Sequence, residues 1–595
     1  MNCENEKITL PSDHSTSMGA LQNWLDTFKR AEPGVGKEPS FGGEPSETGG
    51  EKKQPLGKDE FANTTVAVKT EDGGIIAVPE ETSLKRTLRG RHIQFIAIGG
   101  SIGTGLFVGS GSNLNTGGPG SIMLAYIIVA LMIIPVIFAL GELSAVLPVT
   151  GAFSTYATRF IDPSWGFAMG WNYHLQWLVT FPLEATAATI LITFWDTDEK
   201  VPKGVWIAIF WFIIAFINLF GVRGYGEFEF FTSLIKVLGI IGFIICAVVI
   251  DCGGSPSGYY MGARGWHTTN AFMNGFKGFC SVFITAAFAF SGTELVGLAA
   301  AETSNPRREI PKASKQVLFR VLLFYILSLF MITLIVPADD DRLQGSSNDA
   351  RASPFVIVIE MGQIYALPQI FNAIILLSAL SVGNASVYGG SRTLLSLAEQ
   401  GMAPKIFRYV DRAGRPLPSV FLSLAFGALG FLIYASNSNT VFTWLLSISG
   451  LSAVFVWGST CLAHIRFRQA WSRQGNTLKM LPWASPLGVW GSVVGVSLNI
   501  LVVIASFYGS AWPVDEGTMT GSDRANNFFQ NMLSLPIVIL FFLGHKLWTR
   551  SRYVHLDEID VQTGRRDPVS EEFLEQERAE IRALPMWKRC LSAIF

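Results

Sequence analysis

Two glycine-rich stretches interrupt long apolar runs and carry groups that suit a charged small ligand. The first is Ile98–Phe107, where glycine stands at positions 99, 100, 103 and 105. Each glycine costs about 1 kcal/mol in a helix interior relative to alanine, so this spacing predicts a broken helix. A break inside a membrane persists only where its freed N–H and C=O groups face protein, water or a ligand. Phe288–Gly297 predicts a second break, with Glu294 at its far side.

The first break has the chemistry of an anion site. The half-helix that begins near Gly105 is expected to present unpaired N–H groups and the positive end of its dipole, which suits a carboxylate. Two interrupted segments in corresponding halves of a membrane protein are typical of a transporter's binding site. The alternative is close helix packing, because the pair Gly99 and Gly103 fits the small-residue pattern of helix contacts. Either stretch alone favours packing, whereas the pair, with an acid in the second, favours a binding site.

Three ionisable side chains fall within predicted membrane spans. Glu184 lies midway along the third apolar segment, Lys236 lies in the fifth and Glu294 in the sixth. A charge at such a position is costly, so each residue is a candidate for function. Groups that gain and lose a proton there suit a carrier that loads and releases H⁺ in every cycle. The alternative is a structural hydrogen-bond partner between helices, and for Glu184 and Lys236 we favour function.

The composition is that of a polytopic membrane protein. Only 15% of the 595 residues are charged, against about 25% in soluble domains. Windows of about 20 apolar residues predict an all-α protein with twelve transmembrane helices. These windows run near 92–113, 119–143, 165–194, 203–221, 230–250, 277–301, 317–337, 366–398, 418–435, 440–465, 486–508 and 533–549.

The chain divides into three predicted regions. Residues 1–88 are rich in Gly, Pro, Ser, Glu and Lys, which predicts a disordered N-terminal tail. Residues 89–549 hold the spans, and residues 550–595 form a charged C-terminal tail. Basic residues gather in alternate loops, as at Arg89, Arg308, Arg412 and Arg466. By the positive-inside rule, both tails are expected in the cytosol.

Neither a metal site nor a nucleic-acid surface is indicated, and an enzyme is disfavoured. The six cysteines form no Cys-x-x-Cys pair and no His-Glu-x-x-His occurs, so we expect no metal and no cofactor. Gly99–Gly103 matches the Gly-x-Ser-x-Gly elbow of hydrolases, but that motif requires a preceding strand and its flanks here are apolar helix. No region concentrates a basic face that would bind nucleic acid. A channel is disfavoured because neither a carbonyl filter nor a ring of like charges is evident.

Several motifs together are similar to one family. They are Gly100–Phe107, Trp171–Tyr173, Pro182–Glu184, Phe290–Thr303, Asn305–Pro311, Ser391–Leu394, Gly401–Pro404 and Gly414–Pro418. This set resembles the fungal amino acid permeases of the amino acid–polyamine–organocation superfamily. The resemblance extends from about Leu84 to the C-terminal tail. It is greater to the broad-range and neutral or proline-type permeases than to the cationic ones.

The resemblance implies a five-plus-five inverted repeat with broken first and sixth helices, followed by two peripheral helices. It also implies roles for individual residues. The substrate carboxylate is expected at Ser101, Gly103, Thr104 and Gly105, the ammonium at Phe288, Ala289 and Ser291, and side-chain selectivity at Gln176 and Ser449. Proton coupling is expected from Lys236 and Glu184, and we add Glu294 because it is an acid beside the second break.

The expected function is proton-coupled symport of amino acids across the plasma membrane by alternating access. The expected partners are the amino acid, H⁺, the lipid bilayer and ubiquitin ligase adaptors that act on the cytosolic tails. A non-transporting amino acid sensor on the same fold is the nearest alternative, although such receptors tend to carry a longer N-terminal domain. A polytopic membrane enzyme is a distant one. The amino acids carried are not specified, because one or two pocket side chains, each worth about 1–3 kcal/mol, decide among them.

Overall fold

The computed structural model describes most of the chain from residue 84 onward and three short segments before it. The described residues are 26–30, 65–69, 75–79, 84–196, 198, 200–344, 353–434, 438–565, 573–576, 579, 583 and 585. All statements below concern these residues.

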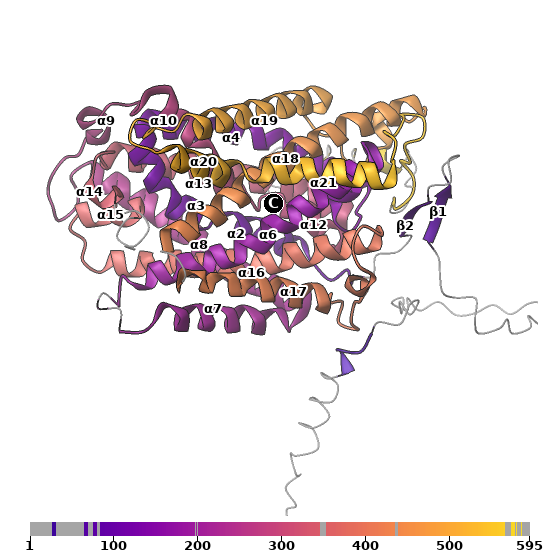
Figure 1. Ribbon diagram of the computed structural model, residues 1–595, viewed down its shortest axis with the longest axis horizontal. Helices are drawn as coiled ribbons and strands as arrows, with labels where there is room; N and C mark the ends of the chain where they lie inside the picture. Colours follow the sequence, from indigo (N-terminus) through magenta and orange to yellow (C-terminus); the bar gives the residue numbers. More distant parts are fainter. Residues whose placement is uncertain are drawn as a thin grey trace, which may run out of the picture.

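Helices make up nearly all of the regular structure (Figure 1). The first half contains α2 (Gly90–Ser101), α3 (Thr104–Phe107), α4 (Gly109–Val146), α5 (Ala152–Phe160), α6 (Pro163–Ile192), α7 (Lys203–Asn218), α8 (Gly221–Asp251), α9 (Arg264–Thr268), α10 (Gly275–Ser281), α11 (Phe283–Phe290), α12 (Leu295–Leu298) and η1 (Ala299–Glu302). The second half contains α13 (Pro306–Ile335), α14 (Asp341–Gln344), α15 (Pro354–Met361), α16 (Leu367–Glu399), η3 (Lys405–Arg408), α17 (Leu417–Gly427), η4 (Ala428–Tyr434), α18 (Ser438–Arg473), η5 (Leu478–Met480), α19 (Gly488–Ala511), α20 (Gly521–Met532) and α21 (Ser534–Thr549).

The number of membrane spans is supported only in part. Within the described residues, nine helical segments are long and apolar enough to cross a membrane, or ten if the bent pair α20 and α21 counts as one span. The other two predicted spans coincide with α7, which has 16 residues, and with the broken pair α2 and α3. A polytopic helical membrane protein is therefore confirmed, and the count of twelve and the inverted repeat stay predictions.

The first predicted break is present. Helix α2 ends at Ser101, and Ile102 and Gly103 are extended before α3 begins at Thr104. The chain then continues into α4, whose Gly118 has a φ of 80° and separates the end of the first predicted span from the second. The prediction that glycine would interrupt the helix here is confirmed, with the second half beginning one residue before Gly105.

The second predicted break is also present. Helix α11 ends at Phe290, and α12 begins after Glu294. Gly292 has a φ of 97°, and a Cβ there would overlap the carbonyl oxygen of Gly100. Only glycine meets both requirements without strain. The two breaks therefore touch through the backbone.

The α6 helix forms the centre of the bundle and packs against α5, α16, α18 and α21 (Figure 1). Helix α2 packs against α8, α13 and α16. As a result, the broken segments lie between α6 on one side and α8 and α13 on the other. Because α6 is almost entirely buried, its polar residues face protein rather than lipid.

The loops that were predicted to be basic meet at one end of the bundle, which we call the basic end. Arg91 pairs with Glu227 of α8 at 2.6 Å, and Gln400 after α16 donates to Ser154 of α5 at 3.1 Å. Arg466 of α18 donates to the carbonyl of Phe160. Elsewhere, Arg342 hydrogen-bonds Asp340 and holds the pKa of that carboxyl below its usual value.

Short segments within the two predicted tails are described by the structure. Strands β1 (Thr65–Lys69) and β2 (Ile75–Pro79) pair antiparallel within the predicted disordered tail, and they are an exception to the all-α class. Alternating Val and Ile residues around Asp72-Gly73 are a hairpin signal that the tail's overall polarity masks. At the other terminus, Ile559 and Val561 are buried in the first part of the predicted C-terminal tail. The backbone N–H of Val554 donates to the carbonyl of Ile161, directly after α5, at 3.0 Å.

A short N-terminal segment docks on the loop between α16 and α17. The backbone N–H of Arg412 donates to the carbonyl of Lys29 at 2.8 Å, and the hydroxyl of Tyr409 donates to the carbonyl of Phe28 at 2.8 Å. The guanidinium of Arg415 lies 4.0 Å from the centre of the Phe28 ring. The same guanidinium pairs with Asp411 at 2.6 Å and donates to the carbonyl of Leu219, between α7 and α8. Arg415 thus joins three separate parts of the chain.

Candidate functional site

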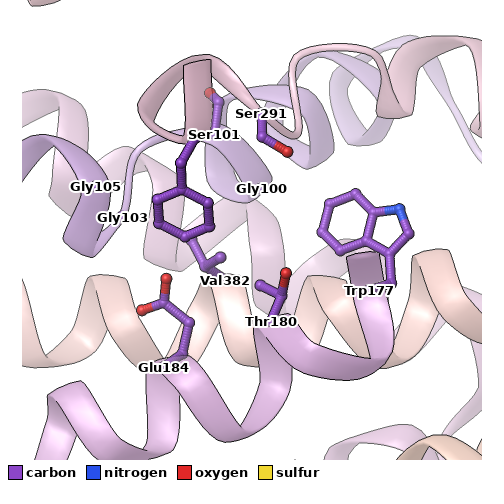
Figure 2. A pocket seen from close by; sticks show the side chains of 10 residues that line it. Gly100, Ser101, Gly103, Gly105, Trp177, Thr180, Glu184, Ser291 and Val382 are labelled. Carbon is purple, nitrogen blue, oxygen red and sulfur yellow. The ribbon is translucent and has the colours of Figure 1, made fainter. Parts of the chain in front are cut away.

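A buried pocket lies where the two breaks face α6. It has a cavity volume of only about 10 Å³ and is lined by Gly100, Ser101, Gly103, Gly105, Trp177, Thr180, Glu184, Phe288, Ser291 and Val382. Figure 2 shows Trp177, Thr180 and Glu184 in a row on one helix, directed toward the broken segments. The sequence named six of these residues for substrate binding or proton coupling: Ser101, Gly103, Gly105, Glu184, Phe288 and Ser291.

Gly105 brings the two broken spans into close contact. A Cβ at this position would lie 2.7 Å from Cδ1 of Phe288 and 2.9 Å from Cα of Ala289. Real Cβ atoms do not approach other heavy atoms this closely, and the backbone of Ala289 cannot move aside as a flexible side chain could. The residue must therefore be glycine for α3 and α11 to adopt this arrangement.

The carboxylate of Glu184 lies at the start of α3. Its Oε1 accepts a hydrogen bond from Oγ1 of Thr104 at 2.9 Å. Its other oxygen, Oε2, has no hydrogen-bond partner among the described residues, although the side chain is 1% exposed. A buried acceptor without a partner is costly, so this oxygen is free to bind a ligand or a proton. The position is the same helix start that the sequence predicted for a substrate carboxylate.

Lys236 of α8 binds the backbone at the end of α2, beside the first break. Its ammonium donates to the carbonyl of Gly99 at 2.6 Å and to the carbonyl of Ile102 at 2.9 Å. These are carbonyls near the end of α2 that the break leaves without their usual helical partners. The side chain is fully buried and interacts electrostatically with both Glu184 and Glu229. Lys236 therefore ties α8 to the break, close to the pocket acid.

Tyr325 of α13 contacts both breaks at once. Its hydroxyl oxygen lies 2.6 Å from the carbonyl oxygen of Ala289 and 2.8 Å from that of Ser101. A phenol carries one hydrogen, so it donates to one of these carbonyls at a time. Ala289, predicted to meet a substrate ammonium, thus already has a donor within the protein. Its carbonyl keeps a second lone pair for another donor.

Gln176 and Ser449 are not among the residues that line the pocket, but each hydrogen-bonds to one that does. Nε2 of Gln176 donates to Oγ of Ser291 at 2.7 Å, and its Oε1 has no partner among the described residues. The hydroxyl of Ser449 lies 2.9 Å from that of Thr180. Because Ser291 and Thr180 line the pocket, the two residues predicted to set selectivity each contact a lining residue, and their role in selectivity stays a prediction.

Glu294 faces away from the pocket and supports the second break. Its carboxylate accepts hydrogen bonds from the backbone N–H of Gly292 at 3.0 Å, from Nε1 of Trp457 at 3.3 Å and from the hydroxyl of Tyr173 at 3.3 Å. Three donors are typical of an acid that fixes a backbone conformation. The coupling role predicted for Glu294 stays a prediction.

The sequence missed Glu229, which the structure brings beside Lys236. Glu229 is fully buried in α8 and accepts hydrogen bonds from Ser381 at 2.6 Å and from Asn384 at 3.1 Å, both in α16. The predicted fifth span began at residue 230, which left this acid outside it. The available signal was its position seven residues before Lys236, which places both side chains on one face of a helix. Tyr325 and Val382 carried no comparable signal.

No group of three or more His, Cys, Asp or Glu side chains in the described part of the chain is arranged to hold a metal ion. Among the described residues, the site combines one buried carboxylate oxygen without a partner and a buried ammonium that donates to two backbone carbonyls. Ionisable groups buried in a membrane protein are candidates for binding charged ligands and protons.

Comparison with known proteins places the chain in a family. Residues 92–558 match the model of the amino acid permease family. The chain is 45% identical to the general amino-acid permease GAP1 of Saccharomyces cerevisiae, over 98% of this chain and 94% of the relative. It is 49% identical to the general amino-acid permease GAP2 of Candida albicans, over 87% and 88% of the two chains. Amino acid transporter 1 of Schizosaccharomyces pombe is 50% identical over 81% of this chain and 83% of its own. The chain therefore belongs to the amino acid permease family, a family of multi-pass membrane proteins that transport amino acids and are not enzymes.

Proposed function

We propose that the protein takes up amino acids by proton-coupled symport, in which Glu184 carries the proton that substrate binding requires. The observation behind this proposal is the contact between Glu184 and Thr104 at the start of α3. The substrate carboxylate is expected at the same helix start, next to Gly103 and Gly105. Two unit negative charges about 4 Å apart repel each other by about 4 kcal/mol at an effective dielectric constant near 20.

Protonation of Glu184 removes this repulsion. The carboxylic acid is neutral and can donate its proton, so an anionic carboxylate is then able to bind beside it. Proton binding therefore precedes or accompanies substrate binding, which is the requirement for symport. The substrate ammonium is assigned to carbonyls near Phe288, Ala289 and Ser291, at the end of α11. The negative end of a helix dipole favours a cation there.

Lys236 is assigned the second coupling role. Its ammonium bridges α8 to the carbonyls of Gly99 and Ile102, and this link weakens when the side chain loses its proton. We assign the basic end of the bundle to the cytosol, on the positive-inside rule, and the protein to the plasma membrane. Ubiquitin ligase adaptors are proposed to act on the tails at that end.

The experiment is uptake by the purified protein in proteoliposomes with an inward proton gradient. Labelled leucine and labelled proline serve as probes, each competed with every other amino acid at two external pH values. Accumulation that disappears when a protonophore collapses the gradient supports symport. Accumulation that persists without the gradient contradicts proton coupling. Binding without any transport identifies the sensor that the sequence left as an alternative.

Selectivity is assigned to Gln176 and Ser449, and we propose a broad-range or neutral and proline-type range. Shortening Gln176 to serine removes its contact with Ser291 but leaves the backbone groups at the two breaks unchanged. We expect Gln176→Ser to change the ranking of competing amino acids, with individual shifts of about 1–3 kcal/mol. A ranking identical to that of the wild type would remove Gln176 from the selectivity pocket.

A further inference from the structure

Buried ionisable groups continue from the pocket toward the basic end beyond the residues used above. Glu184 and Lys236 are adjacent electrostatically, and Glu229 is the next charged group on α8. Glu229 precedes Lys236 by seven residues, a separation of about 10 Å along a helix axis. It therefore lies nearer to Glu227 and Arg91, which pair at the basic end.

Glu229 and Lys236 contact the same residue of the broken helix. Lys236 donates to the carbonyl of Gly99, and a Cβ on Gly99 would overlap Oε2 of Glu229 and Oγ of Ser233. The carboxylate and the ammonium thus lie on two sides of one glycine. Because Gly99 has no side chain, the carboxylate of Glu229 and the ammonium of Lys236 can both approach α2 at this residue.

The titratable and charged groups in this region come from α8 itself and from several neighbouring helices. On its own helix, Lys236 and Tyr225 interact electrostatically with it, and Tyr225 lies one turn nearer the basic end. Helix α16 contributes the uncharged donors Ser381 and Asn384. Further ionisable groups of the described chain lie around Lys236 and Tyr225: Glu184 of α6 beside Lys236, and His92 of α2, Tyr388 and Arg392 of α16 and Glu302 of η1 around Tyr225 and Gly226.

The hydroxyl of Tyr225 continues the line toward the basic end. It is buried without a hydrogen-bond partner among the described residues, and its ring stacks on Tyr388 with centroids 4.4 Å apart. Tyr388 donates to Glu302 at 2.7 Å, and Arg392 pairs with the same carboxylate at 3.3 Å. Ionisable side chains are thus present from the pocket to the end where α16 meets η1.

We propose that Glu229 is a second proton-carrying residue, which accepts the proton from Lys236 and releases it toward the basic end. The proposal rests on the proton-coupled symport argued above. In the transfer, an N–H bond of the Lys236 ammonium breaks and an O–H bond of Glu229 forms, so that two opposite charges become a neutral amine and a neutral acid. The carboxylic acid then loses its proton to water at the basic end and returns to the carboxylate.

The transfer changes two helix contacts together. A neutral amine binds the carbonyls of Gly99 and Ile102 more weakly than an ammonium does, which loosens α8 from the first break. A neutral Glu229 is a weaker acceptor for Ser381 and Asn384, which loosens α8 from α16. Passage of the proton thereby frees α8 from both neighbours, and it does so at the step that precedes substrate release.

The test compares two assays on Glu229→Gln in proteoliposomes, with labelled leucine or labelled proline, whichever the wild type accumulates more. In equilibrium exchange at equal pH, the proton need not leave the carrier, and we expect a rate close to that of the wild type. In accumulation driven by an inward proton gradient, the amide cannot accept a proton, and we expect a loss of about tenfold. The variant's accumulation should also lose the pH dependence of the wild type.

Three variants make the result specific. Ser381→Ala removes a hydrogen bond to Glu229 but leaves the acid able to titrate, so it should keep pH-dependent accumulation. Glu227→Gln, on the same helix but half-exposed, should do the same. Glu229→Asp restores a titratable group and should recover the pH dependence at a lower rate.

Two results would overturn the proposal. One is gradient-driven accumulation by Glu229→Gln with the wild-type pH profile. The other is an equal loss of exchange and accumulation in both Glu229→Gln and Ser381→Ala, which would make Glu229 a structural partner of α16. A wild-type protein that transports without responding to the gradient would instead refute the symport on which this proposal rests.

Discussion

At the scale of single residues, the site depends on places where a side chain must be absent. Gly105 is the clearest case, because its Cα faces Phe288 and the backbone of Ala289. We expect Gly105→Ala to reduce uptake by about tenfold or more, because the added methyl group pushes α3 away from α11 and distorts the pocket. The measurement is initial uptake rate normalised to the amount of protein at the cell surface.

Gly242 of α8 provides the matched control. A Cβ there would meet nothing within 4 Å, and alanine is favoured over glycine in a helix. Gly242→Ala should therefore transport as the wild type does. Normal uptake and apparent affinity in Gly105→Ala would show that the close approach of the two breaks is not required.

At the scale of elements, α13 positions the two breaks relative to each other through one hydroxyl. Tyr325→Phe removes the donor that lies between the carbonyls of Ser101 and Ala289. Leaving a buried carbonyl unsatisfied costs about 1–3 kcal/mol, so we expect a lower melting temperature and a KM raised by about tenfold. Thermal unfolding in detergent and the concentration dependence of uptake measure the two effects.

Tyr365 allows the same change to be made where it should have no effect, because this side chain is 91% exposed. Tyr365→Phe should leave both measurements at their wild-type values. If Tyr325→Phe also matches the wild type in both, the hydroxyl does not hold the two breaks.

At the scale of the whole molecule, the C-terminal segment after α21 stabilises the basic end. Ile559 is 2% exposed, and its carbonyl accepts a hydrogen bond from Gln474, directly after α18, at 2.7 Å. Ile559→Ala should destabilise the fold by about 2–5 kcal/mol, because truncating a buried isoleucine removes apolar contacts and leaves a cavity. The melting temperature of the purified protein measures this loss.

Ile406 of η3 is the control for that change, since the same side chain is 65% exposed there. Ile406→Ala should not shift the melting temperature. An equal melting temperature for Ile559→Ala and the wild type would show that the C-terminal segment contributes nothing to stability.

The features that could be read from the sequence are those that follow from local chemistry. Clustered glycines place both breaks correctly, because their effect on a helix does not depend on what packs nearby. Lys236 and Glu184 stand out because charges are rare in apolar segments. The neighbours of these residues could not be read in the same way. Tyr325 is an ordinary aromatic residue in an apolar helix, and its role follows only from the packing of α13 against two distant segments.

Glu229 shows a different limit. It is an acid at the edge of an apolar window, where charged residues are common and usually exposed. Its burial depends on Ser381 and Asn384, which are more than 150 positions away along the chain. The docking of residues 26–30 was missed for a similar reason, because a polar tail gives no indication of the surface that it contacts.

The docking of that N-terminal segment has a thermodynamic consequence. Arg415 contacts Phe28 and Thr27 while it also donates to Leu219, at the junction of α7 and α8. The loosening of α8 proposed above would therefore change the free energy with which the N-terminal segment is held. Linkage between two binding equilibria is reciprocal. If substrate changes the affinity of another protein for the released N-terminal segment by some factor, that protein changes the carrier's affinity for substrate by the same factor. Substrate binding at the transport site and release of the N-terminal segment to other proteins are then thermodynamically coupled.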